Sequence, residues 1–390
     1  MIPSERLAGV PEYPFARWAA HCRAAEGHGL DVIRLDMGNP DLPPPPAVIE
    51  AACDALRLPT GHGYPGYRGS DELRHAVCAY YERRFGVPLD PESQVACLLG
   101  SKEGIVHLQQ AILDPGDVVL LPDPGYAPYA AAAVLSRATI VRFPLAAQRD
   151  HVPDFDAIPA ESARRAKAIW LNYPNNPTGA VADAETLERA VAFARERGLL
   201  LCHDAPYADV RFDGCRPMSI LQVPGAADVA IEFNSLSKTY NMAGWRIGYA
   251  VGNAEALGLL RRMKSNVDSG LFRPLQRAAV AALGTDEAWI EERNEVYRNR
   301  LAVLVDALAA AGLGAAIPRA TLYLWARVPD GETAEPFALR LLNETGIAVA
   351  PGTFFGPAGE GFVRVSATAS TPRIREAAAR LDAWVSSDWA

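Results

Sequence analysis

The segment 232–253, EFNSLSKTYNMAGWRIGYAVGN, constrains the fold most, because it places a lysine and an arginine between two apolar runs typical of buried strands. Lys238 is either a solvated loop lysine, as lysines usually are, or an amine removed from water and pressed toward a second cation. In the second case it loses its proton more readily and becomes a nucleophile toward carbonyl groups. Ser235, Ser237 and Arg246 together suit a phosphate group, which arginine holds by a two-pronged charged hydrogen bond.

From Pro46 onward the chain alternates apolar runs with amphipathic helical patterns, which predicts a mostly parallel sheet covered by helices. A chain of 390 residues exceeds one ordinary core, so we expect two domains. The first is a large α/β domain over 46–285. The second is a smaller α+β domain, made of an extended N-terminal arm over 1–45 and of residues 286–390. A long helix over 286–311 is expected to bridge them.

Two local signals refine this outline. Pro3, Pro11 and Pro14 interrupt the N-terminal arm and predict that it forms no long helix. Ser70 is expected to cap a helix that runs through Phe85, in a capping-box arrangement with the acidic residues that follow it.

Composition narrows the classes of function. The net charge of −8 and the isoelectric point of about 5.5 lack the basic character that nucleic-acid binding requires. No apolar run approaches the ~18 residues that span a bilayer, and the N-terminal stretch lacks the apolar core of a signal peptide. The six cysteines show no CxxC spacing, which favours reduced thiols, and the seven histidines show no metal-ligand spacing. We therefore expect a cytoplasmic protein that binds no nucleic acid, membrane or metal.

Polar residues follow several predicted strands, at the edge where ligands bind in open α/β sheets. Gly100–Glu103 lies at a strand-to-helix turn, so the backbone N–H groups of Ser101 and Lys102 are free to bind an anion. Tyr126 follows a Pro-Gly turn and either packs in the core or projects over this edge. Asp204 ends an apolar strand; it either caps a turn or, if buried, needs a cation as its partner.

Other candidate positions have equally plain alternatives. The segment 38–41 and the YPNNPTG stretch around Asn176 both suit ordinary turns. Tyr64 could simply pack its loop, and Arg364, inside the strand FVRVS, could lie on the surface. The residues alone leave these interpretations open.

The motif SLSKTYNMAGWRIGYAVG resembles the lysine motif of fold-type-I pyridoxal phosphate (PLP) aminotransferases of class I/II. GSKEG, LNYPNNPTGAV, CHDAPY, VDSGLF and GPAGEG resemble the LL-diaminopimelate aminotransferase-like branch of this family, so the likeness covers nearly the whole chain. The resemblance implies the fold-type-I architecture, PLP as the cofactor, and transfer of an α-amino group between an amino acid and a 2-oxo acid. It also implies a homodimer with shared active sites.

The resemblance implies a role for each candidate residue. Lys238 forms the Schiff base with PLP and, once the substrate amine has freed it, moves the α-proton. Asp204 keeps the pyridine nitrogen protonated, Tyr126 stacks on the ring, and Asn176 and Tyr207 share its phenolic oxygen. The phosphate is held by Ser101, Lys102, Ser235, Ser237, Arg246 and, from the partner subunit, Tyr64. The residues beside the substrate are Gly38, Asn176 and Arg364, of which Arg364 clamps the α-carboxylate.

Three departures from the family pattern bear on the substrate. Asn39 and Arg68 stand where relatives often carry an acidic residue, and Ala243 stands where threonine is usual. No clear second cation is aimed at a distal carboxylate, so we expect a larger amino acid with a polar distal end rather than aspartate. By resemblance, we also expect cis peptide bonds before Pro124 and Pro177.

Two other functions remain open at this point. A PLP enzyme of this family could divert the substrate carbanion into β/γ-elimination, replacement, annulation or oxidation, with the same lysine, aspartate and arginine. A transcription regulator with an aminotransferase-like domain would need a fused basic DNA-binding module. The chain has neither the extra length nor the basic charge for such a module.

Overall fold

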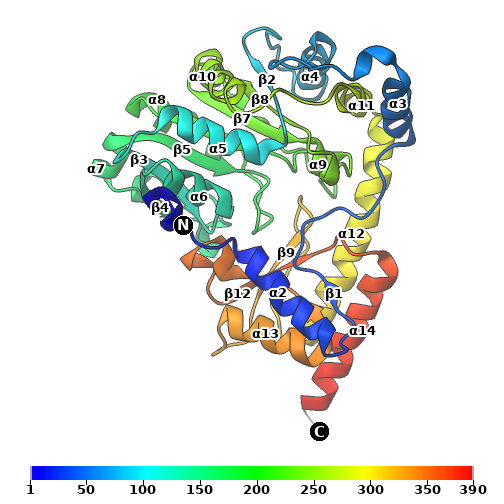
Figure 1. The fold of residues 1–390 in the computed structure, drawn as a ribbon. Helices are drawn as coiled ribbons and strands as arrows, with labels where there is room; N and C mark the ends of the chain where they lie inside the picture. The colour runs from blue at the N-terminus through cyan, green and yellow to red at the C-terminus, as the bar shows by residue number, and fades with distance from the viewer. Residues whose placement is uncertain (1, 389–390) are drawn as a thin grey trace.

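A seven-stranded sheet forms the centre of the computed structural model, which describes residues 2–388 (Figure 1). Its strands are β2 (Val95–Leu98), β3 (Val118–Asp123), β4 (Thr139–Pro144), β5 (Ala166–Asn172), β6 (Leu200–Asp204), β7 (Ala230–Ser235) and β8 (Gly248–Gly252). They lie in the order β2-β8-β7-β6-β5-β3-β4. β8 runs antiparallel to its two neighbours, β2 and β7, and all other neighbouring strands are parallel. The predicted α/β fold with a mostly parallel sheet is thus confirmed.

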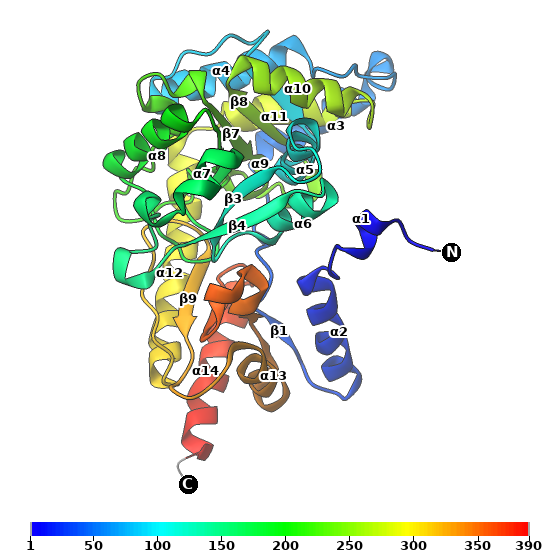
Figure 2. The same ribbon diagram turned by 90° about the vertical axis from the view of Figure 1, so that its left-hand side faces the viewer.

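Helices cover both faces of this sheet, and Figure 2 shows α7 and α8 on one side of the strands and α5 and α6 on the other. The apolar cluster on one face takes residues from α3 (Pro46–Arg57), α4 (Asp71–Phe85), α7 (Ala160–Arg165), α8 (Ala184–Arg197) and α11 (Arg273–Leu283). The cluster on the other face takes residues from α5 (Ser101–Ile112), α6 (Ala127–Leu135) and α10 (Ala254–Ser265). Both faces of most strands are therefore buried, which explains their continuous apolar runs, whereas the edge strand β4 is largely exposed.

A second group of elements lies below the sheet in Figure 1 and surrounds a separate apolar cluster. Its antiparallel sheet has the order β11-β12-β9, and β1 pairs in parallel with β10. These strands are β1 (Ile33–Arg34), β9 (Tyr323–Arg327), β10 (Ile347–Ala348), β11 (Ala350–Pro351) and β12 (Phe362–Ser366). The helices are α2 (Pro14–Gly27), α12 (Glu287–Ala310), α13 (Ala334–Thr345) and α14 (Thr371–Asp388), whereas the short α1 (Glu5–Ala8) lies beside α6 of the upper group. The long α12 runs from the upper group into the lower one, as expected.

The expectation of an extended N-terminal arm is wrong for residues 14–27, which form α2. Pro14 occupies the first helical position, where no N–H is needed, so it starts the helix instead of breaking it. Trp18, Cys22 and Ala25 bury one side of α2 in the lower cluster. Tertiary packing thus stabilises a helix that its prolines seemed to exclude.

The capping box expected at Ser70 is also wrong. The Ser70 hydroxyl does accept a hydrogen bond from the amide of Leu73, so the predicted cap itself is present. A capping box needs Glu or Gln at the third helical position, and that position is Leu73. The peptide bonds before Pro124 and Pro177 are cis, as expected, and the bond before Pro174 is cis as well.

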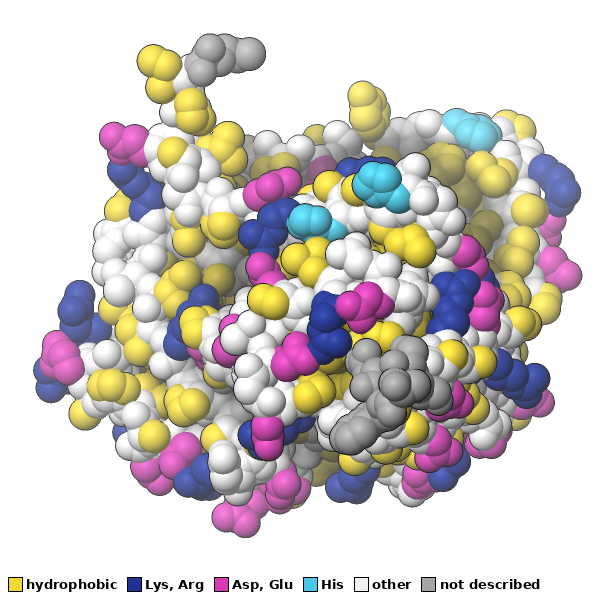
Figure 3. All heavy atoms as spheres, turned by 90° about the horizontal axis from the view of Figure 1, so that it is seen from below, with side chains coloured by type: hydrophobic (Ala, Val, Ile, Leu, Met, Phe, Trp, Pro, Cys, Tyr) yellow, Lys and Arg dark blue, Asp and Glu magenta, His cyan; other side chains and the backbone are white. Residues whose placement is uncertain are grey.

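Two features of the described residues concern membranes and metals. None of the helices within residues 2–388 combines the length and apolar character needed to cross a bilayer. The same residues contain no group of three or more His, Cys, Asp or Glu side chains arranged to hold a metal ion. The face seen from below in Figure 3 carries basic and acidic side chains interspersed with one another.

Candidate active site

The predicted site residues meet at one edge of the central sheet. The parallel strands β5, β6 and β7 end there at Asn172, Asp204 and Ser235, and β2 ends there beside the start of α5. The antiparallel β8 brings in the residues that precede it. A cavity of about 380 Å³ lies at this edge. Of the predicted site residues, those that line it are Gly38, Ser101, Lys102, Tyr126, Asn176, Asp204, Tyr207, Ser235, Ser237, Lys238, Arg246 and Arg364.

Tyr64 is the predicted site residue that does not line this cavity. It lies in the loop before α4, and 85% of its surface is exposed. A role in the cavity of its own chain is therefore excluded by this geometry. Its exposure is compatible with the predicted contact across a dimer interface.

One end of the cavity is built to receive an anion. Ser101 begins α5, so backbone N–H groups and the positive end of the helix dipole point into it. Ser235 and Ser237 are almost completely buried at the end of β7 and in the short helix α9 (Leu236–Thr239). Gly100 has a φ of 85°, and a Cβ there would lie 2.4 Å from Arg246 Nη2. Glycine at this turn thus lets the guanidinium approach the start of the helix.

Asp204 lines the cavity with one carboxylate oxygen unpaired. Its Oδ2 accepts a hydrogen bond of 2.7 Å from the Tyr129 hydroxyl, whereas the buried Oδ1 has no partner among the described residues. Burial raises the pKa of Asp204 to about 6. A buried carboxylate of this kind is stabilised by a cationic donor at Oδ1. The structure therefore places an acceptor for one N–H group at this point.

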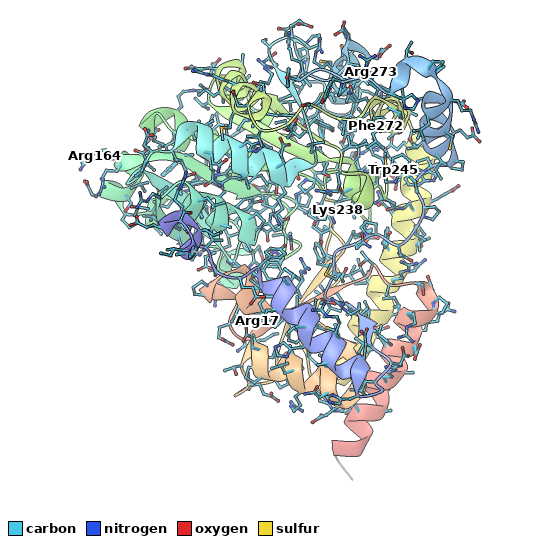
Figure 4. The ribbon with its side chains drawn as sticks, viewed as in Figure 1. Arg17, Arg164, Lys238, Trp245, Phe272 and Arg273 are labelled. Atoms are coloured by element: carbon cyan, nitrogen blue, oxygen red, sulfur yellow. The ribbon has the colours of Figure 1, made fainter. Side chains whose placement is uncertain are left out.

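Lys238 lies near the middle of the molecule, between the sheet and the lower group of elements (Figure 4). Its ammonium group donates to the backbone carbonyl of Gly38. Burial lowers the pKa of Lys238; the Arg364 and Arg246 guanidinium groups lower it further, and Tyr323 opposes them. The solvated loop lysine considered above is excluded, and a larger share of the amine is free at neutral pH.

Arg364 occupies the other end of the cavity and is only 3% exposed, so the surface alternative is wrong. Its Nη1 donates to Asn176 Oδ1 at 2.8 Å and its Nη2 donates to the Asp36 carbonyl at 2.7 Å, while the buried Nε has no partner among the described residues. The guanidinium carbon lies 4.1 Å from the centre of the Tyr323 ring and 5.3 Å from that of Phe15. An arginine held this way suits a planar carboxylate.

Several residues of this site were not predicted from the sequence. Tyr129, which binds Asp204, lies one helical turn after Tyr126, and that spacing is the signal that could have found it. The hydroxyl groups of Tyr323 and Tyr207 form a hydrogen bond of 2.8 Å. The Tyr323 hydroxyl also lies so close to position 38 that only glycine fits there. Phe15 belongs to the misjudged helix α2. Its contact with Arg364 has no local sequence signal.

Comparison with known proteins agrees with this geometry. The model of the family described as "Aminotransferase class I and II" matches residues 30–381. The chain belongs to this family.

The similarity to individual members of aminotransferase class I and II extends over nearly the whole chain. The chain is 50% identical over 380 residues to the LL-diaminopimelate aminotransferase of Desulforudis audaxviator, and the match covers 97% of each chain. A probable N-succinyldiaminopimelate aminotransferase from Thermus thermophilus is 40% identical, with a TM-score of 0.89 over 95% of this chain and 99% of that one. Substrate-bound BacF from Bacillus subtilis is 36% identical, with a TM-score of 0.93 over 98% of each chain.

Membership of this family establishes the reaction class. Aminotransferases of class I and II use PLP, and the protein is a PLP-dependent transferase that moves an amino group between an amino acid and a 2-oxo acid. The fold-type-I architecture is confirmed by the same solved structures. The alternative in which the carbanion is diverted is not favoured by these relatives.

Proposed function

We propose that the cavity binds PLP, with its phosphate at the end formed by Ser101, Lys102, Ser235, Ser237 and Arg246. The observation that carries this proposal is the unpaired Oδ1 of buried Asp204, which is ready to accept one N–H from a cationic ring nitrogen. The donor set at the anion end suits a phosphate dianion, because it combines helix N–H groups, hydroxyls and a guanidinium. The residues present therefore fit the cofactor.

Other residues of the cavity would orient the ring. Tyr126 lines the cavity as it begins α6, and its ring is available for stacking on the face of the cofactor. Asn176 and Tyr207 lie on the side of the cavity nearer to Arg364, and we assign their polar atoms to the ring oxygen. These assignments come from the family pattern and are supported by the placement of all three residues in one cavity.

The remaining chemistry follows from Lys238 and Arg364. Bound PLP supplies an electron sink that makes the α-hydrogen of an amino acid acidic. Lys238 holds the cofactor and then removes and returns that proton with its ε-amine, whose pKa is lowered by burial. Arg364 holds the α-carboxylate, and the resulting orientation brings the α-hydrogen toward Lys238. Gly38, whose carbonyl accepts from Lys238, closes the substrate side.

We propose LL-diaminopimelate as the first amino donor to test, because the curated relatives at 43–50% identity carry the name LL-diaminopimelate aminotransferase. This compound is a larger amino acid with a polar distal end, as the sequence led us to expect, although that end carries a carboxylate beside its amino group. A second hollow of about 610 Å³ shares Tyr13, Phe15, Met37 and Asn39 with the cofactor cavity and offers room for a long side chain. A preference for a different substrate would arise at Asn39, Arg68 and Ala243.

We also propose a homodimer in which Tyr64 serves the phosphate site of the partner subunit. Large apolar side chains are exposed on the chain before and after Tyr64, namely Leu58 and Tyr67, and on the segment between α10 and α11, namely Val267 and Phe272. Arg273 donates to the carbonyls of Thr60 and Tyr64, both at 3.3 Å, and so ties this loop to the start of α11, beside Phe272 (Figure 4). An apolar surface of this kind is typical of an interface.

Mixed dimers test this arrangement. If Tyr64 acts across the interface, Tyr64→Phe and Lys238→Ala both damage the same site of a hybrid dimer and leave the other site intact, so mixing the two inactive or impaired proteins should restore one working site. Activity that stays at the level of the separate variants would show that Tyr64 does not act across the interface.

The proposal also covers the cellular compartment and the domain boundaries. We place the protein in the cytoplasm, since its six cysteines are free thiols, which suits a reducing compartment. We place the domain boundaries near residues 45 and 285, because α12 begins at Glu287 and its apolar side chains enter the lower cluster. Tyr207, Val210 and Phe212 also belong to that cluster, so the large domain contributes to it.

The decisive experiment compares Lys238→Ala with Lys167→Ala. Lys167 is a surface lysine paired with Asp117, and its replacement should leave the protein yellow and active. Lys238→Ala should lose the visible absorbance of lysine-bound cofactor and its turnover. With the wild type, LL-diaminopimelate alone should bleach this absorbance and a 2-oxo acid should restore it. A Lys238→Ala variant that keeps both the absorbance and the activity would refute the assignment.

A further inference from the structure

Arg293 on α12 is a buried cation that contacts two segments of the active site. It is 3% exposed, and its guanidinium donates to two backbone carbonyls. Nη1 donates to the carbonyl of Lys238 at 2.8 Å, and Nη2 donates to the carbonyl of Asp209 at 3.1 Å. Asp209 follows Asp204 and Tyr207 in the same segment of chain. One guanidinium therefore links the lysine to the segment that carries the ring-binding aspartate.

The local structure explains why Lys238 needs a donor from outside. Its helix, α9, ends at Thr239, and the last carbonyls of a helix have no amide one turn further along to bind. The amides of Tyr240 and Met242 both donate to Leu236. A cation at the carboxyl end of a helix is also favoured by the helix dipole. Arg293 thus caps the helix from which Lys238 projects.

The second contact is equally well anchored. The carbonyl of Asp209 also accepts from Asn294 Nδ2 at 3.0 Å. The carboxylate of Asp209 is occupied by Arg84 Nε at 2.7 Å and the Tyr80 hydroxyl at 2.6 Å. The Asp209 backbone is therefore held in place in the core. Because Arg293 binds both carbonyls, it fixes the Lys238 backbone relative to Asp209.

Burial of the Arg293 guanidinium costs free energy that two hydrogen bonds to carbonyls do not explain by themselves. Its Nε is buried without a partner among the described residues, and burial lowers the pKa of Arg293 to about 10, although it remains a cation at neutral pH. The carboxylate of Asp209, which opposes this decrease in the pKa of Arg293, already pairs with Arg84. A buried cation without a carboxylate of its own costs stability, so simple packing does not explain it.

We propose that Arg293 is a positioning residue, whose two-pronged contact holds the backbone of Lys238 at a fixed place relative to Asp204 and Tyr207. The inference rests on the proposed function, since it assumes that Lys238 bonds to the cofactor and carries the proton. A lysine with a loose backbone attacks and transfers protons from a broader set of positions, which slows chemistry more than it weakens substrate binding.

The test compares four proteins: wild type, Arg293→Met, Arg293→Lys and Asn294→Ala. Asn294→Ala is the matched control, because it removes a neighbouring bond to the same Asp209 carbonyl and leaves the bond to Lys238 in place. Arg293→Lys keeps the charge but cannot hold both carbonyls in a planar fork. Each protein is measured for kcat, KM, thermal midpoint and the rate at which visible absorbance develops when PLP is added to cofactor-free protein.

In both Arg293 variants, kcat should fall at least tenfold and the rate of absorbance development should fall by a similar factor, while KM stays within about threefold. Asn294→Ala should lower the thermal midpoint yet keep kcat and the loading rate within about twofold. If Arg293→Met does not fold, Arg293→Lys carries the test. Variants that lose stability but keep wild-type kcat and loading rate would overturn the proposal.

These results separate the inference from the function on which it rests. A wild-type protein whose absorbance does not depend on Lys238 would refute the proposed function. A wild type with lysine-dependent absorbance, together with unchanged loading and turnover in Arg293→Lys, would refute only the role of Arg293. An equal loss of kcat in Asn294→Ala would also refute it, because that loss would need no contact with Lys238.

Discussion

The two ends of the cavity are built in different ways. The anion end is formed at the carboxyl ends of neighbouring strands and at the start of α5, so its parts are placed by one sheet. The carboxylate end brings Arg364 together with Asn176, with the backbone of Asp36 and with the Tyr323 ring. These four come from four separate segments of chain, and only the segments of Arg364 and Tyr323 are neighbours in one sheet.

This difference predicts how each end responds to change. A substitution at the anion end removes one donor among several on a rigid frame, so its effect should remain local. A substitution at the carboxylate end leaves buried partners unpaired in other segments, so its effect should be larger. We therefore expect changes at the anion end to alter the affinity for PLP, and changes at the carboxylate end to alter kcat/KM for the amino acid.

The largest effect is expected from Arg364→Met. We expect kcat/KM to fall about 10³-fold, or roughly 4 kcal/mol, because a buried charged partner of the substrate carboxylate is lost. The affinity for PLP should stay within about threefold, measured by titration of the visible absorbance. Arg327→Met, on the neighbouring strand β9 with an exposed side chain, is the control and should change neither quantity. A matching loss of PLP affinity would contradict the separation of the two ends.

A smaller effect concerns Asp204, which lies between the ends. Its pKa is about 6 in the folded chain against an ordinary 3.8, so the folded state binds more protons between these values. The free energy of unfolding of the cofactor-free protein should therefore decrease as the pH rises from about 4 to 6. Asp204→Asn lacks this penalty and should be about 3 kcal/mol more stable at pH 8, with no difference below pH 4.

Denaturant unfolding at several pH values measures this difference. The exposed Asp330→Asn variant provides the control, and its stability relative to wild type should not depend on pH in this way. An Asp204→Asn variant that is less stable than wild type at pH 8 would mean that Oδ1 is not an uncompensated acceptor.

Arg246→Met should have a more modest effect at the anion end. Loss of a charged hydrogen bond costs about 2 kcal/mol, so the Kd for PLP should rise about 30-fold. At saturating PLP, kcat/KM should stay within about threefold, because the carboxylate end is untouched. A loss of kcat/KM that added PLP does not restore would show that Arg246 also serves the substrate.

The smallest effect is expected from Lys102→Met. The Lys102 ammonium lies 4.3 Å from the centre of the Tyr13 ring, at the mouth of the cavity, while its backbone belongs to the start of α5. We therefore expect KM to rise about fivefold, or roughly 1 kcal/mol, with PLP affinity within about twofold. Titration of PLP against this variant assigns the ammonium to one end, and a weakened PLP affinity with unchanged KM would reverse our assignment.

Prediction from the sequence succeeded where the determinants are local. Ser101, Tyr126, Asp204 and Ser235 each follow or end a strand, and the parallel order brings such positions to one edge. It failed for α2, because prolines at a helix start and within a helix look alike until packing is known. Tyr323 and Phe15 were missed because their contacts with Arg364 join distant segments.

By itself the sequence determined most of the strands, most of the helices and the motif residues, since hydrophobic periodicity and turn residues act over a few positions. Only the tertiary structure decided which polar groups are buried and which of them lack a partner. The Oδ1 of Asp204, the contact of Arg293 with the Lys238 carbonyl and the bonds of Arg364 all fall in this second class. Their free energies depend on removal from water, which requires packing of segments that are remote in the chain.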